Sequence, residues 1–249
     1  MQQFDDNLHK AIKSEDGTFT AFSQEYNEHY HSTKDGALNE SLYKHIIPAF
    51  ELSKGKGELH ILDICYGLGF NTLATLYYHK QNNLGTKLFI YSPELDSQLV
   101  KNLRFFHYPQ EFKFFTEIIE ALSTKQFYQD ENFTIEVFLG DAREYVKKFE
   151  NRFDIVYQDA FSPSVNPVLW TQEYFSDIKK SMKENGVITT YSTALKTRLA
   201  LYNNGFRVYL NEGENYRNAT VASLAQLPLK EVDMQHKIKC NPTVEPLRD

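Results

Sequence analysis

The stretch LHILDICYGLGFN, residues 59 to 71, decides the fold class that we predict for this chain. Its apolar start, LHILDI (59–64), is typical of a buried strand, and two glycines, Gly67 and Gly69, follow it. A helical pattern, NTLATLYYHKQ, comes after this glycine loop. Glycine lets a ligand approach the backbone, and a helix start offers free N–H groups. The order predicts a strand, a cofactor-binding loop and a helix, although an ordinary βα turn contains the same elements.

The same alternation of strand-like and helix-like segments continues along the chain. Two predicted helices, TQEYFSDIKKSMKEN and ALKTRLALYNN, are each followed by a glycine that stops the helix, Gly186 and Gly205. Alternating strands and helices predict an α/β fold with a parallel sheet, and two late strands joined by a short loop predict an antiparallel edge. This is the outline of the class I, Rossmann-like methyltransferase sheet. The further predicted strands are KLFIYS (87–92), FTIEVFLGD (133–141), FDIVYQD (153–159), GVITTYS (186–192), FRVYLN (206–211) and ATVASLAQL (219–227).

We divide the chain into three parts. Residues 1–56 are predicted to form a small N-terminal extension, with a hairpin in GTFTAFSQEYNEHY and a helix in NESLYKHIIPAFELS. Asn39 is the expected helix cap, and Pro48 interrupts the helix interior. Residues 57–228 form the Rossmann-like domain, and the tail 229–249 is expected to be partly disordered.

Composition narrows the class of protein. The chain has 249 residues, of which 41% are hydrophobic, and no apolar run is long enough to cross a bilayer. Its first residues carry charges where a signal peptide needs an apolar stretch, so we expect a cytoplasmic protein. Cys65 and Cys240 do not make a disulfide framework, and no Cys/His group has metal-ligand spacing, so we expect no metal. The net charge of −6 argues weakly against nucleic-acid binding.

The glycine loop distinguishes between two cofactors. A dinucleotide site needs a third glycine, but position 72 is Thr72. Asp63 lies just before the glycines, where a carboxylate would repel a pyrophosphate and attract a cation. We therefore expect S-adenosyl-L-methionine, which carries a sulfonium and an ammonium, rather than the cofactor of an NAD-dependent oxidoreductase.

Three more acidic residues follow predicted strands. Glu94 is expected to accept hydrogen bonds from both ribose hydroxyls of the cofactor, although it is also readable as a solvated loop acid. Asp141 and the Ala142 N–H are expected to bind the adenine, although Asp141 is also a suitable helix cap. Asp159 ends the fourth predicted strand, beside the expected methyl group. It is placed to orient an acceptor amine that must lose a proton before it attacks.

The loop after Asp159 is expected to hold the acceptor. FSPSVNP (161–167) contains two prolines that limit its motion, and Phe161 is suited to stacking on a base. We expect Phe161, Ser162 and Pro163 to contact the substrate. The alternative is a structural loop after a strand-end acid.

Four motifs in this chain resemble the methyltransferase domain of the MnmC family, the bifunctional enzymes that modify the tRNA wobble uridine, and its stand-alone relatives. LDICYGLGFN is similar to a family loop GFGTGLN, and DAFSPSVNPVLW to the more specific family loop DGFAPAKNPEMW. The resemblance covers roughly residues 16 to 225. The other motifs are EHYHSTKDGALNES and GVITTYSTALKTRLALYNNGFRV.

The resemblance implies a specific reaction. Such enzymes use S-adenosyl-L-methionine to methylate the exocyclic amine of 5-aminomethyluridine, often 2-thiolated, at the wobble position. It implies that Asp159 is the catalytic carboxylate and that Glu94 and Asp141 hold the ribose and adenine. It also implies that Ser32 and Glu40, in the extension, close over the cofactor.

The chain departs from the family pattern at three places. Cys65 replaces the first glycine of the loop, and Gln158 and Ala160 flank Asp159 where the family has Leu and Gly. We identify no FAD-binding oxidase domain, so we expect the substrate to carry its aminomethyl group already.

The expected partner is the anticodon loop of tRNA, whose phosphates require basic residues. Lys196 and Arg198 are the preferred pair, although each basic group is also readable as a solvated helix face. Two other functions stay open: transfer to a small amine, as in an aminopropyltransferase-like enzyme, and a catalytically inactive tRNA-binding module. The oligomeric state is left open.

Overall fold

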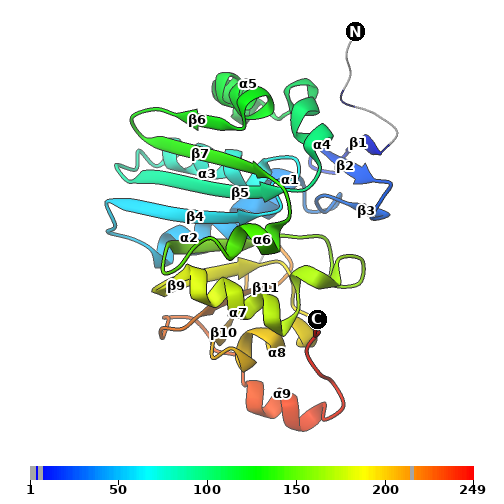
Figure 1. Cartoon of the computed structure of the whole chain (residues 1–249), viewed down its shortest axis with the longest axis vertical. Helices are drawn as coiled ribbons and strands as arrows, with labels where there is room; N and C mark the ends of the chain where they lie inside the picture. Colours follow the sequence, from blue (N-terminus) through cyan, green and yellow to red (C-terminus); the bar gives the residue numbers. More distant parts are fainter. Residues whose placement is uncertain (1–3, 5–7, 214–215) are drawn as a thin grey trace.

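The computed structural model describes Phe4, residues 8–213 and residues 216–249. Within them, one sheet of eight strands dominates the fold, in the order β10-β11-β9-β8-β4-β5-β7-β6 (Figure 1). Five neighbouring strands, β9-β8-β4-β5-β7, are parallel, while β10, β11 and β6 pair antiparallel. The predicted α/β class and antiparallel edge are therefore confirmed. The strands are β4 (Glu58–Ile64), β5 (Lys87–Glu94), β6 (Phe127–Gln129), β7 (Phe133–Leu139), β8 (Phe153–Gln158), β9 (Met182–Thr190), β10 (Arg207–Asn211) and β11 (Ala219–Ser223).

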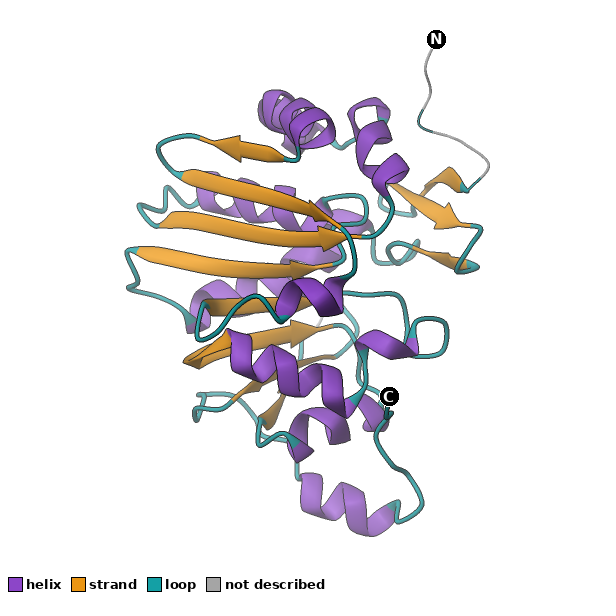
Figure 2. Cartoon of the chain, in the orientation of Figure 1, coloured by secondary structure: helices purple, strands orange, loops and turns teal. Residues whose placement is uncertain are grey.

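Helices cover both faces of this sheet (Figure 2). Side chains alternate along a strand, so β4 sends Ile61 into one core and Leu62 into the other. Burial on both faces explains why the central strands are nearly continuous apolar runs. One core includes α3 (Phe70–Gln81), α4 (Ser97–Asn102), η2 (Leu103–Phe105), η3 (Gln110–Phe115) and α5 (Thr116–Lys125); the other includes α6 (Ala142–Val146), η4 (Pro167–Leu169), α7 (Gln172–Ser181), α8 (Leu195–Asn203) and α9 (Met234–Cys240).

The chain order reverses at β4. From this strand the sheet continues through β5 and β7 on one side and through β8 and β9 on the other. Ligands of open α/β sheets bind outside the carboxyl ends of the strands at such a switch point. The glycine loop after β4 and Asp159 after β8 both lie there, because Ile64 at the end of β4 pairs with Gln158 at the end of β8.

A small three-stranded antiparallel sheet stands beside the carboxyl ends of the parallel strands (Figure 1). It contains β1 (His9–Lys13), β2 (Phe19–Ser23) and β3 (Glu28–His29). The hairpin expected in residues 17–30 corresponds to β2 and β3, where Phe22 pairs with His29. The sequence pattern did not predict β1.

The helical segment of the extension has an unusual middle turn. It consists of α1 (Ala37–Glu40), a π-helical turn η1 (Ser41–Ile46) and α2 (Ile47–Leu52). The Ile47 N–H bonds to the Leu42 carbonyl, five residues back. Pro48 has no N–H to give to the Lys44 carbonyl, so the wider turn accommodates it without breaking the helix. The expected cap was wrong, because the helix starts after Gly36 and Asn39 lies inside it.

One predicted helix end was also wrong. Helix α7 ends at Ser181, and β9 begins at Met182 rather than at Gly186. A Cβ on Gly186 would lie 2.9 Å from the carbonyl oxygens of Lys183 and Phe153, so this glycine permits a close backbone approach at a register shift between β8 and β9. Gly205, in contrast, follows α8 with φ +88°, as expected for a helix stop.

The tail is ordered, contrary to expectation. It carries α9, and the Leu247 carbonyl accepts a hydrogen bond of 2.9 Å from the Gln172 N–H at the start of α7. The Asp249 carboxylate accepts another, of 2.8 Å, from the Thr171 hydroxyl. Across the described ranges, no helix has the length and apolarity that a membrane span requires.

Candidate active site

A cavity of about 860 Å³ opens at the carboxyl ends of the parallel strands. Its walls come from the loops after β4, β5, β7 and β8, from the N-terminal extension and from the loop between β10 and β11. Among the predicted site residues it is lined by Ser32, Glu40, Gly67, Glu94, Asp141, Ala142, Asp159 and Phe161. Asp63, Gly69, Ser162, Pro163, Lys196 and Arg198 are not part of its lining.

The glycine loop has left-handed backbone at three positions. Gly67 and Gly69 have φ values of 53° and 74°, and Cys65 has a φ of 65°. A Cβ on Gly69 would lie 2.8 Å from the Tyr66 hydroxyl, and one on Gly67 would lie 3.2 Å from the Tyr30 ring. Cys65 thus keeps the conformation that glycine favours, at a steric cost of about 1–2 kcal/mol for a residue with a Cβ.

Glu94, at the end of β5, holds the glycine loop through a hydrogen bond. Its Oε2 accepts a hydrogen bond of 2.8 Å from the Gly67 N–H, and its Oε1 accepts one of 2.9 Å from the Asp96 N–H. Burial raises the pKa of this carboxyl above its usual value, although both backbone donors act in the opposite direction. An ionised carboxylate can accept about four hydrogen bonds, so Glu94 has capacity left for cofactor hydroxyls.

Asp141 caps helix α6 and also lines the cavity. Its Oδ1 caps α6, accepting from the N–H groups of Arg143 and Glu144 at 2.7 and 3.2 Å. The residue also lines the cavity, together with Ala142, the first residue of α6. The capping alternative is therefore confirmed, and cofactor binding by the same side chain stays a prediction.

Asp159 reaches the cavity directly after β8. Asn71 donates from Nδ2 to its Oδ2 over 2.8 Å, and Nε2 of His45 lies 3.3 Å from its Oδ1. Burial alone would raise the pKa of Asp159, but the charge of His45, then His31 and the Asn71 hydrogen bond, hold it below its usual value. Asp159 is thus a partly buried carboxyl group whose pKa is held low by its neighbours, which favours the ionised form.

Asp63 lies beneath the cavity rather than in its wall. It is 1% exposed, and its Oδ2 accepts a hydrogen bond of 2.8 Å from the Thr72 hydroxyl. Burial, together with the negative charge of Asp159, raises the pKa of Asp63 to about 7, against the effect of its hydrogen bonds. Asp63 therefore supports the glycine loop and helix α3 instead of contacting a ligand from the cavity wall.

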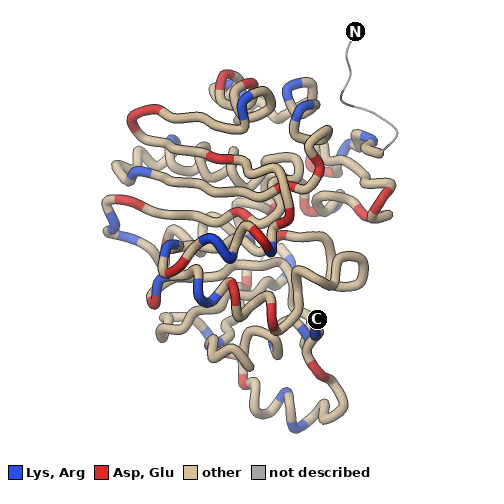
Figure 3. The backbone as a smooth tube through the Cα atoms, viewed as in Figure 1, with Lys and Arg blue, Asp and Glu red and all other residues tan. Residues whose placement is uncertain are grey.

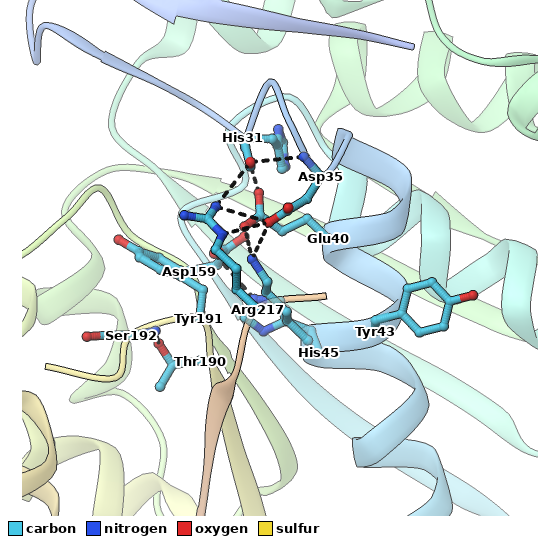
Figure 4. Close-up of polar contacts among 12 residues, drawn as sticks. His31, Asp35, Glu40, Tyr43, His45, Asp159, Thr190, Tyr191, Ser192 and Arg217 are labelled. Atoms are coloured by element: carbon cyan, nitrogen blue, oxygen red, sulfur yellow. Dashed lines mark hydrogen bonds and ion pairs between the residues drawn. The ribbon is translucent and has the colours of Figure 1, made fainter. Parts of the chain in front are cut away.

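Ser32 and Glu40 belong to a network that joins the extension to the loop between β10 and β11 (Figure 4). The Ser32 N–H donates to Glu40 over 2.7 Å, and the buried Lys44 ammonium lies between Glu40 and Asp35, at 2.6 and 3.1 Å. Arg217 donates to Asp35 over 3.0 Å and to the Ser32 hydroxyl over 3.1 Å. Both oxygens of Glu40 are therefore engaged by protein groups.

The predicted acceptor loop packs against the extension. Phe161 stacks on Tyr26 with ring centroids 4.6 Å apart, and the Ser162 N–H donates to Glu28 over 3.1 Å. Trp170 donates from its indole N–H to the Phe161 carbonyl over 2.8 Å, which anchors the loop from its other end. One face of Phe161 is therefore covered by a protein ring, while Ser162 and Pro163 lie at the loop surface outside the cavity wall.

Gln158, one of the departures from the family motif, has a structural explanation. It is fully buried, donates to the Leu169 carbonyl over 2.9 Å and accepts from the Tyr174 hydroxyl over 3.0 Å. Gln158 thus ties the end of β8 to η4 and α7. Ala160 is also buried, and its carbonyl accepts from Tyr191 over 2.9 Å.

The two predicted phosphate contacts differ in exposure. Lys196 is exposed on α8. Arg198 is 8% exposed and donates from Nε to the Thr220 hydroxyl over 3.1 Å, so it faces β11 and cannot meet a phosphate at the surface. The Arg198 prediction was wrong because α8 turns this position toward the sheet.

Sequence reasoning missed the residues that reach the site from a distance in the chain. His45 and Arg217 carried no local motif, since their partners lie elsewhere in the sequence; His31 stands inside the motif EHYHSTKDGALNES but was not singled out as a site residue. Asn71 stands inside the quoted motif GLGFN and was the one with a usable signal, because it opens the helix beside the predicted carboxylates.

The charge around the cavity suits a cationic ligand. Acidic positions gather where the parallel strands end beside the small sheet (Figure 3). The acidic residues of its wall are Glu25, Glu28, Glu40, Glu94, Asp96, Asp141 and Asp159, against Lys34 and Arg217 among the Lys and Arg residues. In the described part of the chain, no cluster of three or more His, Cys, Asp or Glu residues is arranged to hold a metal ion.

Comparison with known proteins identifies the family to which this fold belongs. A family model described as S-adenosyl-L-methionine-dependent methyltransferase matches residues 109–225. The crystal structure of MnmC2 from Aquifex aeolicus is 32% identical, with a TM-score of 0.84, over 99% of this chain and 81% of that one. Residues Gly67 to Asn71 and Asp159 thus stand in a fold shared with a solved relative, and the TM-score extends the likeness over nearly the whole chain.

Two curated relatives are longer than this chain. An uncharacterized protein of Methanocaldococcus jannaschii is 32% identical over 210 residues, which are 80% of this chain and 54% of that protein. The bifunctional protein MnmC of Campylobacter hominis, named for tRNA 5-methylaminomethyl-2-thiouridine biosynthesis, is 26% identical over 78% of this chain and 29% of its own length. The chain thus spans about half of the first relative and less than a third of the second.

The fold, the charge of the cavity and the relatives agree on the cofactor, S-adenosyl-L-methionine. The near-complete overlap with MnmC2 also confirms the resemblance drawn from the four sequence motifs. The chain belongs to the MnmC2 family of S-adenosyl-L-methionine-dependent methyltransferases.

Proposed function

We propose that this methyltransferase methylates the primary amine of 5-aminomethyluridine, with or without a 2-thio group, at the wobble position of tRNA. The observation that carries the proposal is Asp159, an ionised carboxylate in the cavity wall at the carboxyl end of β8, followed by the loop that resembles the family's acceptor loop. The relatives named for 5-methylaminomethyl-2-thiouridine biosynthesis support the choice of substrate.

The cavity residues fit the cofactor by chemistry. When bound, S-adenosyl-L-methionine supplies an electrophilic methyl group on a positively charged sulfur. We assign the ribose hydroxyls to Glu94 and the adenine to Asp141 and the Ala142 N–H, with Gly67 and Gly69 allowing the close approach of the backbone. Ser32 and Glu40 act indirectly, because their network closes the extension over the cavity.

Asp159 acts on the acceptor amine. A protonated alkylamine has no lone pair for attack, so one N–H proton must leave before a C–N bond forms and the C–S bond breaks with its electron pair going to sulfur. A carboxylate held at the cavity wall accepts a hydrogen bond from that N–H, aligns the nitrogen for an in-line attack and receives or passes on the proton. The cavity supplies this carboxylate in its ionised form.

A small amine is the second candidate acceptor. The acidic wall of the cavity, including Glu25 and Glu28 on the extension, would attract a small cation as well as the cofactor. Against this, the acceptor loop exposes Val165, which is 39% exposed and lies outside the cavity lining, as a surface that a large substrate could cover and a small amine in the cavity would not reach.

The test is a comparison of acceptors. The protein and methyl-labelled S-adenosyl-L-methionine are incubated with one acceptor in each of several parallel reactions. The acceptors are tRNA that carries 5-aminomethyluridine, the same tRNA with unmodified wobble uridine, and a panel of small primary amines. Label in 5-methylaminomethyluridine after nucleoside analysis supports the proposal. Cofactor binding with label only in small amines replaces it by the second candidate.

A further inference from the structure

His45 lies behind Asp159, outside the cavity wall. Its side chain is 0% exposed, its Nε2 is 3.3 Å from Oδ1 of Asp159, and its Nδ1 is 3.0 Å from the Thr189 hydroxyl. His45 does not line the cavity, whereas Asp159 does. The three side chains therefore form a row, Thr189, His45 and Asp159, of which only Asp159 lines the cavity and can meet a substrate there.

The π-helical turn of the extension carries His45 into this position. Within η1 the extra residue per turn changes the direction in which side chains leave the helix, and such turns often occur at functional sites. The His45 ring packs edge-to-face on Tyr157, with centroids 5.8 Å apart and an interplanar angle of 72°. Tyr157 is on β8, two residues before Asp159, so strand and helix fix the pair together.

The groups around His45 come from several elements. Asp159 follows β8, Asp63 is on β4 and His31 precedes α1; Lys44 neighbours it on η1. Among the described residues, the side-chain hydroxyl that bonds the Nδ1 of His45 is that of Thr189. The Nε2 atom has Asp159 as its nearest charged neighbour.

The two oxygens of Asp159 are held from different sides. Oδ2 receives the Asn71 amide over 2.8 Å, and Oδ1 faces His45. Because each carboxylate oxygen can accept a second hydrogen bond, both contacts leave Asp159 able to bind an amine.

We propose that His45 is a positioning residue: Thr189 orients its ring, its Nε2 faces Oδ1 of Asp159 over 3.3 Å, and this contact aims the carboxylate at the acceptor amine. This inference deepens the proposed function and rests on it for the identity of the acceptor. The contact between His45 and Asp159 itself is independent of the acceptor.

The first experiment measures transfer kinetics. His45→Gln keeps an N–H donor but removes the imidazole, and Thr189→Val removes the group that orients the ring. The controls are His60→Gln, a buried histidine stacked on Phe89 in the same sheet, and Thr190→Val, the next buried threonine. We expect kcat to fall by about 10–100-fold in the two test variants, less than the roughly 10²–10⁴-fold contribution of a group that transfers the proton itself, because His45 acts through Asp159. KM and cofactor affinity should be unchanged.

The second experiment needs no substrate. With aspartate labelled by ¹³C at Cγ, the resonance missing from Asp159→Asn identifies Asp159, and its titration is followed by NMR. His45→Gln is expected to raise the pKa of Asp159, because the charge of His45 is a main cause of its depression, whereas His60→Gln is expected to leave it unchanged.

The outcomes separate the two claims. A fall in kcat together with a raised pKa of Asp159 supports the inference. If Asp159 titrates as in the unmodified protein, the inference is overturned, whether kcat is unchanged or falls with thermal stability as for a core residue. If the pKa rises but wild-type protein labels no tRNA, the contact stands and the proposed substrate is wrong.

Discussion

Asn71 bridges two carboxyl groups: its Nδ2 donates to Asp159 over 2.8 Å and lies 3.4 Å from Oδ1 of Asp63. The two groups share this amide but differ in environment. Burial raises the pKa of Asp63 to about 7, while His45 holds the pKa of Asp159 below its usual value. Neighbouring carboxyl groups whose pKa values are shifted in opposite directions take different roles. Here Asp159 is the ionised group that faces the cavity.

The raised pKa of Asp63 predicts a stability that depends on pH. Between about pH 4 and pH 7 the unfolded chain has lost the Asp63 proton and the folded protein keeps it, so the free energy of unfolding falls as the pH rises, by about 1.4 kcal/mol per pH unit from this group. Above pH 7 the contribution is constant. Asp63→Asn should lack this component. Its free energy of unfolding, measured by urea at pH 5, 6, 7 and 8, should therefore depend less on pH than that of the unmodified protein.

The control for that measurement is Asp177→Asn, at a partly exposed aspartate paired with Lys180 on α7. Its pH dependence should follow that of the unmodified protein. Parallel curves for Asp63→Asn and the unmodified protein would show that Asp63 is ionised throughout.

The two cysteines are expected to react at different rates. Burial, followed by the negative charges of Glu94 and Asp159, raises the pKa of the Cys65 thiol, whereas Cys240 is exposed on α9. Since the thiolate is the reactive form, iodoacetamide at pH 8 should modify Cys240 at least about tenfold faster. Peptide mass spectrometry over time measures both rates. Equal rates would mean that Cys65 is open to solvent and less desolvated than the structure shows.

The Tyr26–Phe161 stack predicts a link between the extension and the acceptor. Tyr26→Ala removes an aromatic pair worth about 0.5–1.5 kcal/mol, so the loop of residues 161–167 should lose order and kcat/KM for tRNA should fall by about 3–10-fold. Phe22→Ala removes a ring of the same small sheet that packs on His29 instead. If both variants reduce kcat/KM equally, the effect comes from the sheet as a whole and not from the stack.

Substitutions of Lys196 and Arg198 should affect the salt dependence of tRNA binding differently. Lys196 is exposed, so Lys196→Ala should weaken tRNA binding and reduce the slope of log K against log salt by about 0.7, the value for one phosphate contact on a single strand. Arg198→Met should leave this slope unchanged and lower the melting temperature, because a buried hydrogen bond to Thr220 is lost. A reduced slope in Arg198→Met would place that side chain at the RNA after all.

The sequence contained most of the fold because its strands are buried on both faces. The runs 59–64 and 153–158 are buried and mostly apolar, and each is followed by a turn, so their ends and their parallel pairing could be predicted. The end of α7 could not, since Lys183, Glu184 and Asn185 are polar and continue a helical pattern. Only the pairing of Met182 with Phe153 turns them into a strand.

The candidate site, like the fold, could be predicted from the sequence only in part. Glu94, Asp141 and Asp159 follow strands, and the topology brings strand ends together, so local reading places them at one edge of the sheet. His45 reaches Thr189, 144 residues away in the chain, from a π-helical turn that ends just before Pro48, and no local pattern encodes such a contact. Ser32 and Glu40 were expected to close over the cofactor, and both line the cavity. Their polar atoms bond within the extension and to distant Arg217, a contact that no local pattern encodes.

The central claim is that the Asp159 carboxylate serves the acceptor amine, and Asp159→Asn tests it most directly. The amide keeps the shape of the side chain but accepts no proton, so single-turnover methyl transfer to tRNA carrying 5-aminomethyluridine should slow by about 10²–10⁴-fold. Cofactor affinity, measured by calorimetry on the same preparation, should stay the same. Transfer at the wild-type rate with intact cofactor binding would contradict the account and remove Asp159 from the reaction.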